Sequence, residues 1–146
     1  MLLNTSNKSE FACGYSTLYG DQCGGLSPMG DLLKKEVYEL ANYYNKIKPG
    51  MIPEEIITRA PSAELRPDQT DQDSLPEYDA LDAAVSKLVT KASAPRGDIE
   101  KWVLKALMRS EFKRWQSPPI LKVTSHALVW GGVCRSPTKR FIRPEI

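Results

Sequence analysis

The sequence has few cysteines, a single histidine and no long apolar run. Its 146 residues include three cysteines, none in a C-x-x-C pair, and one histidine, His126. These counts disfavour a disulfide framework, a zinc site and a histidine-based triad, and reduced thiols in a cytoplasmic protein are the simplest interpretation. No run reaches the roughly 20 apolar residues of a membrane span. No basic segment followed by an apolar run marks a signal peptide.

An excess of charge of one sign is also lacking. The formal net charge is +2 at pH 7, which gives little support for nucleic-acid binding. Hydrophobic residues make up 41% of the chain and charged residues 26%, as in ordinary soluble domains, so disorder of the whole chain is not expected. The length is sufficient for one domain with its own core, and no internal repeat is present.

The first helix is expected over residues 7–19, where apolar side chains recur at helical spacing. Asn7 and Glu10 are spaced as a capping box at its start. Gly20 is placed to end it, because glycine readily adopts the left-handed conformation of a helix C-terminus.

Three more segments show helical periodicity, and a proline followed by two glutamates marks another short helix. The expected helices cover residues 31–44, a start at Pro53, 76–91 and 97–115. Asp31 is predicted to cap the first of these, and Ser74 to open the helix at 76–91. Because the apolar faces of the 31–44 and 97–115 helices need a sheet to pack on, we expect marginal stability.

Strand signals are few. Leu2 and Leu3, before a polar cluster, resemble the end of a buried strand that enters a ligand-binding loop, and one short strand is expected at 121–124. A glycine-rich loop covers 20–30, and residues 60–75 are either a linker or an ordered binding loop. The fold class is therefore α/β, mostly helical in the part present, with the edges of a parallel sheet.

Several polar residues lie where they could bind phosphate. Thr5 belongs to a cluster between a strand end and a helix start, and Glu10 in the first helical turn could hold Mg²⁺ bound to phosphates. A plain capping glutamate is the alternative. Lys34 opposes the dipole of its helix, which a nearby anion would explain. A solvated surface lysine is equally compatible with the pattern.

Three further positions allow both a structural and a functional interpretation. Asp21 follows a glycine and could orient ammonia or a polar substrate group, or could simply complete a turn. Ser62 lies in a proline-containing acidic loop. Lys113 and Arg114 end a helix, where cations favourably meet the negative end of the helix dipole.

The order of the motifs is more specific than any single residue. Four stretches occur in sequence: TSNKSEFACGYSTLYGD, SPMGDLLKKEVYELA, IPEEIITRAPSAELRPDQTDQDSLPEYDALD and EFKRWQSPP. Over residues 2–119 they resemble the C-terminal half of NAD synthetase, a family of N-type ATP pyrophosphatases. The resemblance implies that 1–119 is the C-terminal half of a Rossmann-like parallel-sheet fold, followed by a poorly matched tail at 120–146.

The resemblance implies ATP-dependent amidation of deamido-NAD to NAD through an adenylate, with ATP and Mg²⁺ as cofactors. The SAELRPDQ stretch is closer to the glutamine-dependent bacterial enzymes, in which a glutaminase domain supplies ammonia. The resemblance also implies a cytoplasmic homo-oligomer, with no nucleic acid or membrane as partner. A related pyrophosphatase that amidates another carboxylate is a weaker alternative.

Site residues are carried over from the resemblance position by position. Thr5, Lys34 and Ser62 match ATP-binding positions, and Glu10 matches a glutamate that contacts both magnesium and substrate. Asp21 and Lys34 match catalytic positions. The implied deamido-NAD contacts are Glu10, Tyr15, Ser16, Thr17, Leu18, Asp21 and Lys113.

The departures from the family pattern concern its central ATP loop. No Ser-Gly-Gly-x-Asp-Ser stretch occurs in the 146 residues, and GGVCRSPTKRF is a poor copy of the family's basic ending. We therefore expect an incomplete fragment that is inactive by itself. The alternative is a non-catalytic remnant that keeps dimerisation or interaction surfaces.

Overall fold

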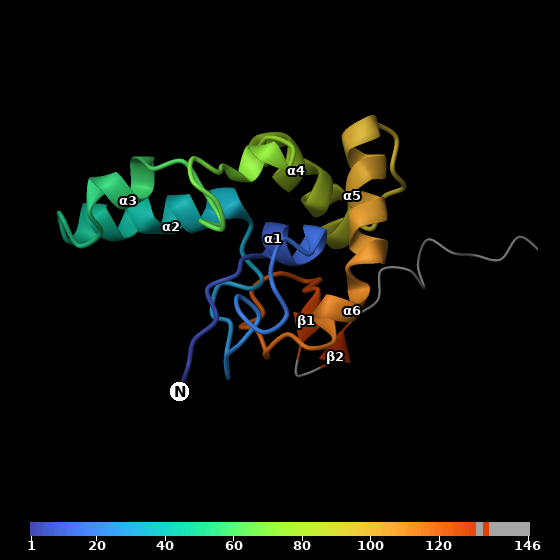
Figure 1. The fold of residues 1–146 in the computed structure, drawn as a ribbon, viewed down its shortest axis with the longest axis horizontal. Helices are drawn as coiled ribbons and strands as arrows, with labels where there is room; N and C mark the ends of the chain where they lie inside the picture. Colours follow the sequence, from blue (N-terminus) through green and yellow to red (C-terminus); the bar gives the residue numbers. More distant parts are fainter. Residues whose placement is uncertain (131–132, 135–146) are drawn as a thin grey trace, which may run out of the picture.

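The structure, a computed structural model that describes residues 1–130 and 133–134, consists mainly of short helices (Figure 1). A 3₁₀ turn, η1, covers Asp71–Asp73, and a π-helical turn, η2, covers Ser86–Thr90 and continues α4. The α-helices are α1 (Lys8–Cys13), α2 (Lys34–Ile47), α3 (Glu54–Thr58), α4 (Tyr78–Val85), α5 (Asp98–Arg109) and α6 (Glu111–Arg114). None of the described helices is long and apolar enough to cross a membrane.

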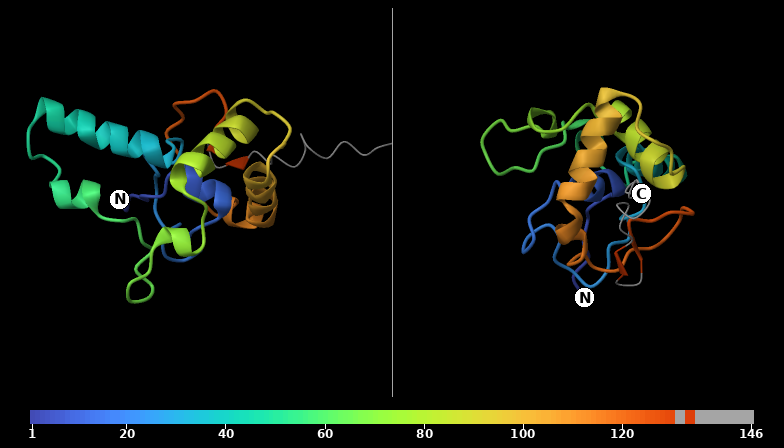
Figure 2. Two further views of the ribbon diagram at one scale, coloured as in Figure 1. Left: turned by 90° about the horizontal axis from the view of Figure 1, so that it is seen from above. Right: turned by 90° about the vertical axis from the view of Figure 1, so that its right-hand side faces the viewer.

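The core lies where α1, α4 and α5 meet, and Figures 1 and 2 show these helices packed together. Its fully buried apolar residues include Phe11, Leu81, Val85, Leu88, Val103, Leu107 and Leu128. The apolar face of α5 therefore packs on other helices, and the expectation that it requires a sheet was wrong. The expected helix at 97–115 is divided at Ser110, which caps the end of α5.

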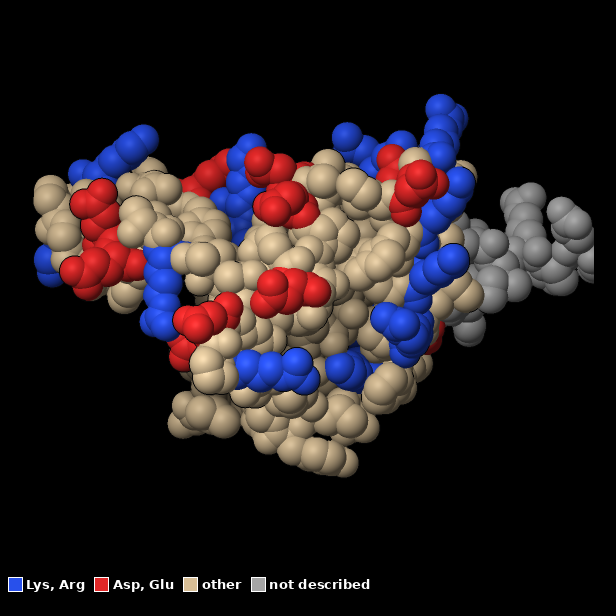
Figure 3. All heavy atoms as spheres, turned by 45° about the horizontal axis from the view of Figure 1, so that its top comes forward, with Lys and Arg blue, Asp and Glu red and all other residues tan. Residues whose placement is uncertain are grey.

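Helices α2 and α3 form an arm that extends away from this core (Figure 1). No residue of α2 is buried. Figure 3 shows acidic and basic side chains scattered between other residues on the arm. Its exposed large apolar residues are Leu40, Tyr43, Tyr44, Ile47, Met51 and Ile56.

The strand ends predicted from the sequence lie side by side as two isolated parallel bridges. Leu3 pairs with Leu26, and Ser27 pairs with Ile120. The Asn4 amide donates to the Leu26 carbonyl at 2.8 Å. The strand expected at 121–124 does not form. The bridge to Ser27 is at Ile120, one residue before that segment. Strands β1 (Val129–Trp130) and β2 (Val133–Cys134) form a separate antiparallel pair.

Two predicted helix boundaries were wrong. Helix α1 begins at Lys8 as its capping box predicts, but ends at Gly14, whose φ of 66° is left-handed. A Cβ at Gly14 would overlap the Cβ of Ser110, so the close approach of α6 also requires glycine there. Ser74 does not cap α4, because Glu77 occupies the N-cap position.

Residues 60–75 form an ordered loop rather than a linker. The Asp71 amide donates to the Pro61 carbonyl at 2.9 Å and closes the loop. Thr70 and Asp73 form a capping box around η1. The loop therefore has a fixed path between the arm and the core.

The two cysteines with described side chains are expected to differ in reactivity. Burial raises the pKa of the Cys13 thiol to about 12, whereas Cys23 is exposed. Iodoacetamide at pH 8 should therefore alkylate Cys23 and spare Cys13 in the folded protein, and peptide mass spectrometry would measure both. Equal native rates would contradict this expectation. The raised pKa of Cys13 also contributes to the free energy of unfolding. Because the thiol ionises near pH 9.0 in the unfolded chain, this contribution is fully present below pH 9 and falls as the pH rises toward 12.

Candidate functional site

A cavity of about 210 Å³ lies between α1, the start of α2 and the loop that follows α3. It brings together residues that are up to 66 positions apart in the sequence, from Thr5 to Asp71. Six of the predicted site residues line it: Thr5, Glu10, Tyr15, Asp21, Lys34 and Ser62. The remaining lining residues are Ser6, Ala63 and Asp71.

Glu10 is both a helix cap and a cavity carboxylate. The Asn7 side chain accepts from the Glu10 amide, and Glu10 Oε2 accepts from the Asn7 amide, each at 3.0 Å. The other oxygen, Oε1, forms an ion pair with Lys34 Nζ at 3.1 Å. One oxygen of Glu10 therefore caps the helix, and the other binds Lys34 at the cavity.

Lys34 is held beside the cavity rather than extended into solvent. Its side chain is 17% exposed, and its ammonium lies 5.1 Å from the centre of the Tyr78 ring. The predicted alternative of a solvated surface lysine was therefore wrong. A carboxylate and an aromatic face together stabilise the cation at this position.

Sequence reasoning missed two groups at this site: Asp71, which lines the cavity, and Tyr78, which does not line it but donates a hydrogen bond to Asp71. Asp71 is 3% exposed, and its Oδ2 accepts from the Tyr78 hydroxyl at 2.6 Å. Asp71 Oδ1 and the Tyr15 hydroxyl are buried without a hydrogen-bond partner among the described residues. Buried polar atoms normally find partners, and these two groups lie close enough to act on each other electrostatically. No local pattern marks this pair, because Asp71 lies in η1 and Tyr78 begins the separate helix α4.

The two phenols are stabilised as neutral hydrogen-bond donors. Burial raises the pKa of the Tyr15 hydroxyl, and the negative charge of Asp71 raises it further. Burial also raises the pKa of Tyr78, and its hydrogen bond to Asp71 adds to the effect. At neutral pH both groups are therefore neutral phenols, of which Tyr15 lines the cavity and Tyr78 donates to Asp71.

A second cavity, of about 220 Å³, adjoins the first and shares Tyr15, Asp21 and Ala63 with it. The predicted residues Ser16, Thr17 and Lys113 line this cavity. Lys113 Nζ donates to the carbonyls of Gly14 and Ser16, both at 2.7 Å. Lys113 therefore holds the loop after α1 in place. The predicted Leu18 lines neither cavity.

Asp21 is exposed and completes a turn while it borders both cavities. Its Oδ2 accepts from the Thr17 amide at 2.9 Å. The neighbouring backbone is tied to the chain start, because Asn4 donates its side-chain amide to the Asp21 carbonyl. The turn and site interpretations of Asp21 therefore both fit its place.

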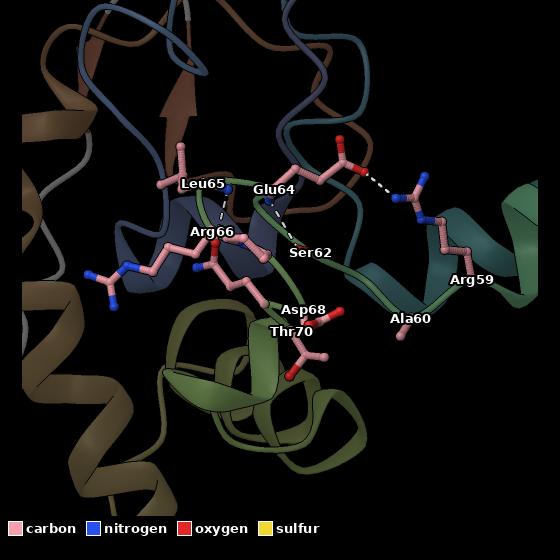
Figure 4. A pocket seen from close by; sticks show the side chains of 10 residues that line it. Arg59, Ala60, Ser62, Glu64, Leu65, Arg66, Asp68 and Thr70 are labelled. Carbon is pink, nitrogen blue, oxygen red and sulfur yellow. Dashed lines mark hydrogen bonds and ion pairs between the residues drawn. The ribbon is translucent and has the colours of Figure 1, made fainter.

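The loop at 59–70 forms the outer wall of the site and encloses a surface hollow of about 640 Å³ (Figure 4). Arg59 and Glu64 form an exposed ion pair at 2.7 Å, and Ser62 Oγ accepts from the Glu64 amide at 3.0 Å. Glu64 and Asp68 have left-handed backbones, with φ of 53° and 55°. The ordered loop thus places Ser62 between the hollow and the inner cavity.

The described residues contain no group of three or more His, Cys, Asp or Glu that could enclose a metal ion. Mg²⁺ usually keeps several waters and is bound by one or two carboxylates together with substrate phosphates. Glu10 fits the role of a single carboxylate ligand of this kind. An ion held by protein groups alone does not fit these residues.

Comparison with known proteins identifies close relatives. A family model for NAD synthase matches residues 1–117. The glutamine-dependent NAD(+) synthetase of Synechocystis sp. is 44% identical, over 99% of this chain and 27% of its own length. The enzymes of the same name from Aquifex aeolicus and Thermotoga maritima are 44% and 38% identical, over 87% and 99% of this chain.

The chain spans about a quarter of the length of these relatives. Among solved structures, NMN synthetase from Francisella tularensis aligns with a TM-score of 0.62 and 28% identity. That alignment covers 84% of this chain and 45% of the other. The helical core therefore has the fold of a part of that protein. The family match over residues 1–117 and these relatives show that the chain belongs to the NAD synthase family.

Proposed function

We propose that this chain supplies part of the synthetase site of a glutamine-dependent NAD⁺ synthetase. The observation that supports the proposal is the cavity that joins Thr5, Glu10, Tyr15, Asp21, Lys34 and Ser62. These residues match binding positions of the family and come from five separate segments. The folding of the chain brings them around one space.

The proposed reaction has two steps. The nicotinate carboxylate of deamido-NAD attacks the α-phosphorus of ATP, so a carboxyl–phosphate bond forms and pyrophosphate leaves. Ammonia then attacks the carbonyl carbon, a carbon–nitrogen bond forms, AMP leaves with the bonding electron pair, and the nitrogen releases one proton to solvent. Catalysis of such steps is mainly positioning and charge stabilisation.

The residues have distinct proposed roles. Lys34 and Ser62 bind ATP phosphates, and Thr5 contacts ATP at the chain start. Tyr15, Ser16 and Thr17 lie along deamido-NAD, with Lys113 closing over it. Asp21 borders both cavities, and its proposed role is to orient ammonia. Leu18 is retained only as a contact inferred from the family, since it lines neither cavity.

Glu10 is the proposed ligand for Mg²⁺, in combination with ATP phosphates. The ion would neutralise phosphate charge. Because Glu10 Oε1 already pairs with Lys34, we expect the ammonium and the ion to compete for the same carboxylate.

We propose that the site on this chain is incomplete. The Ser-Gly-Gly-x-Asp-Ser loop that contacts pyrophosphate in the family is absent from the 146 residues. On this proposal residues 1–119 are the C-terminal half of a Rossmann-like synthetase domain, with a tail at 120–146. The complete enzyme would be a cytoplasmic homo-oligomer with a glutaminase domain that feeds it ammonia.

Replacement of Lys34 by alanine is expected to weaken binding of ATP–Mg²⁺ to this chain by about tenfold to a hundredfold. A hydrogen bond to a charged group contributes about 1.5–3 kcal/mol, which corresponds to that range. Calorimetric titration would measure it. Lys35→Ala is the matched control, because Lys35 is exposed and does not line the inner cavity. Absence of ATP–Mg²⁺ binding to the wild type would contradict the proposal.

The purified wild-type chain also tests the proposal that its site is incomplete. We expect no NAD⁺ formation from deamido-NAD, ATP, Mg²⁺ and ammonium by the chain alone. Turnover comparable to that of a full-length relative would show that the site is complete.

A second candidate function is a non-catalytic interaction module. The observation that favours it is the exposed apolar surface of the α2–α3 arm. Size-exclusion chromatography beside the calorimetry distinguishes the two. A stable dimer that binds no nucleotide would favour the interaction module over the enzyme fragment.

A further inference from the structure

Helix α2 begins without a side-chain cap of its own. Leu33 occupies the N-cap position and has no group that can accept a hydrogen bond. The first amides of a helix lack partners within the helix and need acceptors from elsewhere. Glu36 accepts from the Leu33 amide, and of the amides that follow, those of Lys34 and Lys35 find acceptors outside the helix.

The acceptors come from two other helices. The Lys34 amide donates to Ser9 Oγ of α1 at 3.2 Å, and the Lys35 amide donates to Asp82 Oδ2 of α4 at 2.8 Å. Ser9 Oγ in turn donates to Asp82 Oδ1. Ser9 is 0% exposed and Asp82 is 4% exposed. A buried hydroxyl and a buried carboxylate together replace the missing cap.

The same two helices also hold the other end of Lys34. Glu10, next to Ser9 on α1, pairs with its ammonium. Tyr78, one turn before Asp82 on α4, places its ring against the same ammonium. Lys34 is therefore held at its backbone amide by α1 and at its side-chain nitrogen by both α1 and α4.

We propose that Ser9 and Asp82 are positioning residues, which fix the first turn of α2 and thereby hold the Lys34 ammonium at the cavity. A buried carboxylate at a helix N-terminus is favourable, and it offsets the unfavourable placement of two lysines in the first turn. The phosphate-binding consequence rests on the proposed function. The cap itself does not depend on that function.

The test uses Asp82→Ala in this chain, with Asp79→Ala as control, since Asp79 is exposed on the same helix. In Asp82→Ala we expect the Lys35 amide to exchange with solvent at least about tenfold faster, by NMR. The ring-current shift that Tyr78 induces in the Lys34 side chain should collapse, and ATP–Mg²⁺ should bind about tenfold more weakly. Asp79→Ala should change none of these.

Asp82→Asn is the variant to measure if Asp82→Ala does not fold. It keeps an oxygen that can accept from the Lys35 amide, so exchange should rise less than in Asp82→Ala. Unchanged amide exchange and an unchanged Lys34 side-chain shift in a folded variant would overturn the inference. If the wild type binds no ATP–Mg²⁺ while both NMR signals respond, the cap stands and the proposed function fails.

Discussion

Replacement of Lys8 by methionine is expected to lower the free energy of unfolding by about 3–5 kcal/mol, because it leaves a buried carboxylate without its partner. Lys8 Nζ lies 2.9 Å from Asp31 Oδ1, and the two side chains are 1% and 0% exposed. The ammonium also donates to the Thr124 hydroxyl at 2.9 Å and the His126 carbonyl at 3.0 Å. One lysine thus joins α1, the loop before α2 and the segment after α6.

Urea denaturation followed by far-UV circular dichroism would measure this change. Lys101→Met is the control, because its ion pair with Asp98 is exposed and should contribute less than about 1 kcal/mol. The double variant Lys8→Met/Asp31→Asn should recover part of the loss, since asparagine still accepts from the Val123 or Thr124 amide. A Lys8→Met variant as stable as the wild type would contradict the expectation.

The same pair predicts a pH dependence. Burial by itself raises the pKa of Asp31, but hydrogen bonds from Thr124, Lys8 and Val123 outweigh it and lower the pKa below 3.8. A lowered folded pKa gives stability that is present above pH 3.8 and is lost as the pH falls through the folded value. The difference between Lys8→Met and wild type should therefore shrink in acid.

Replacement of Arg114 by methionine is expected to lower the free energy of unfolding by about 3 kcal/mol or more. Arg114 is 1% exposed and donates to the Phe11 carbonyl at 3.1 Å, to Ser110 Oγ at 2.8 Å and to the Leu107 carbonyl. Each buried acceptor left without a donor costs about 1–3 kcal/mol. The guanidinium also stabilises the negative ends of α1 and α5, where these carbonyls lie.

Thermal and urea unfolding of Arg114→Met would be compared with Arg109→Met, whose arginine is exposed on α5. Arg114→Lys should be intermediate, because it keeps the charge but loses the planar fork that reaches several acceptors. Equal stability of Arg114→Met and Arg109→Met would refute the structural role.

The capping box at Asn7 and Glu10 shows why the start of α1 was predictable. Its two hydrogen bonds join residues three positions apart, so the sequence contains both partners. The C-terminus of the same helix was misplaced by several residues. Gly14, not Gly20, adopts the left-handed conformation, and the packing of Ser110 decides between them.

The prediction that Asp31 caps the helix at 31–44 was wrong for a related reason. Its position before an amphipathic stretch is typical of an N-cap, and local spacing supports that interpretation. The structure instead buries it against Lys8 and against the amides of Val123 and Thr124. The true partners lie 23 residues before and about 92 residues after it, beyond the reach of any local pattern.

The sequence by itself determined the family, the amphipathic helices and six residues around the inner cavity, because motif order and helical periodicity are properties of the chain. Only the tertiary structure decided that Asp71 and Tyr78 join that site and that Asp82 caps α2. It also decided which charges are buried. The Asp82 cap and the Lys8–Asp31 pair join groups 47 and 23 positions apart in sequence, whose meeting follows from how the helices pack rather than from local propensity.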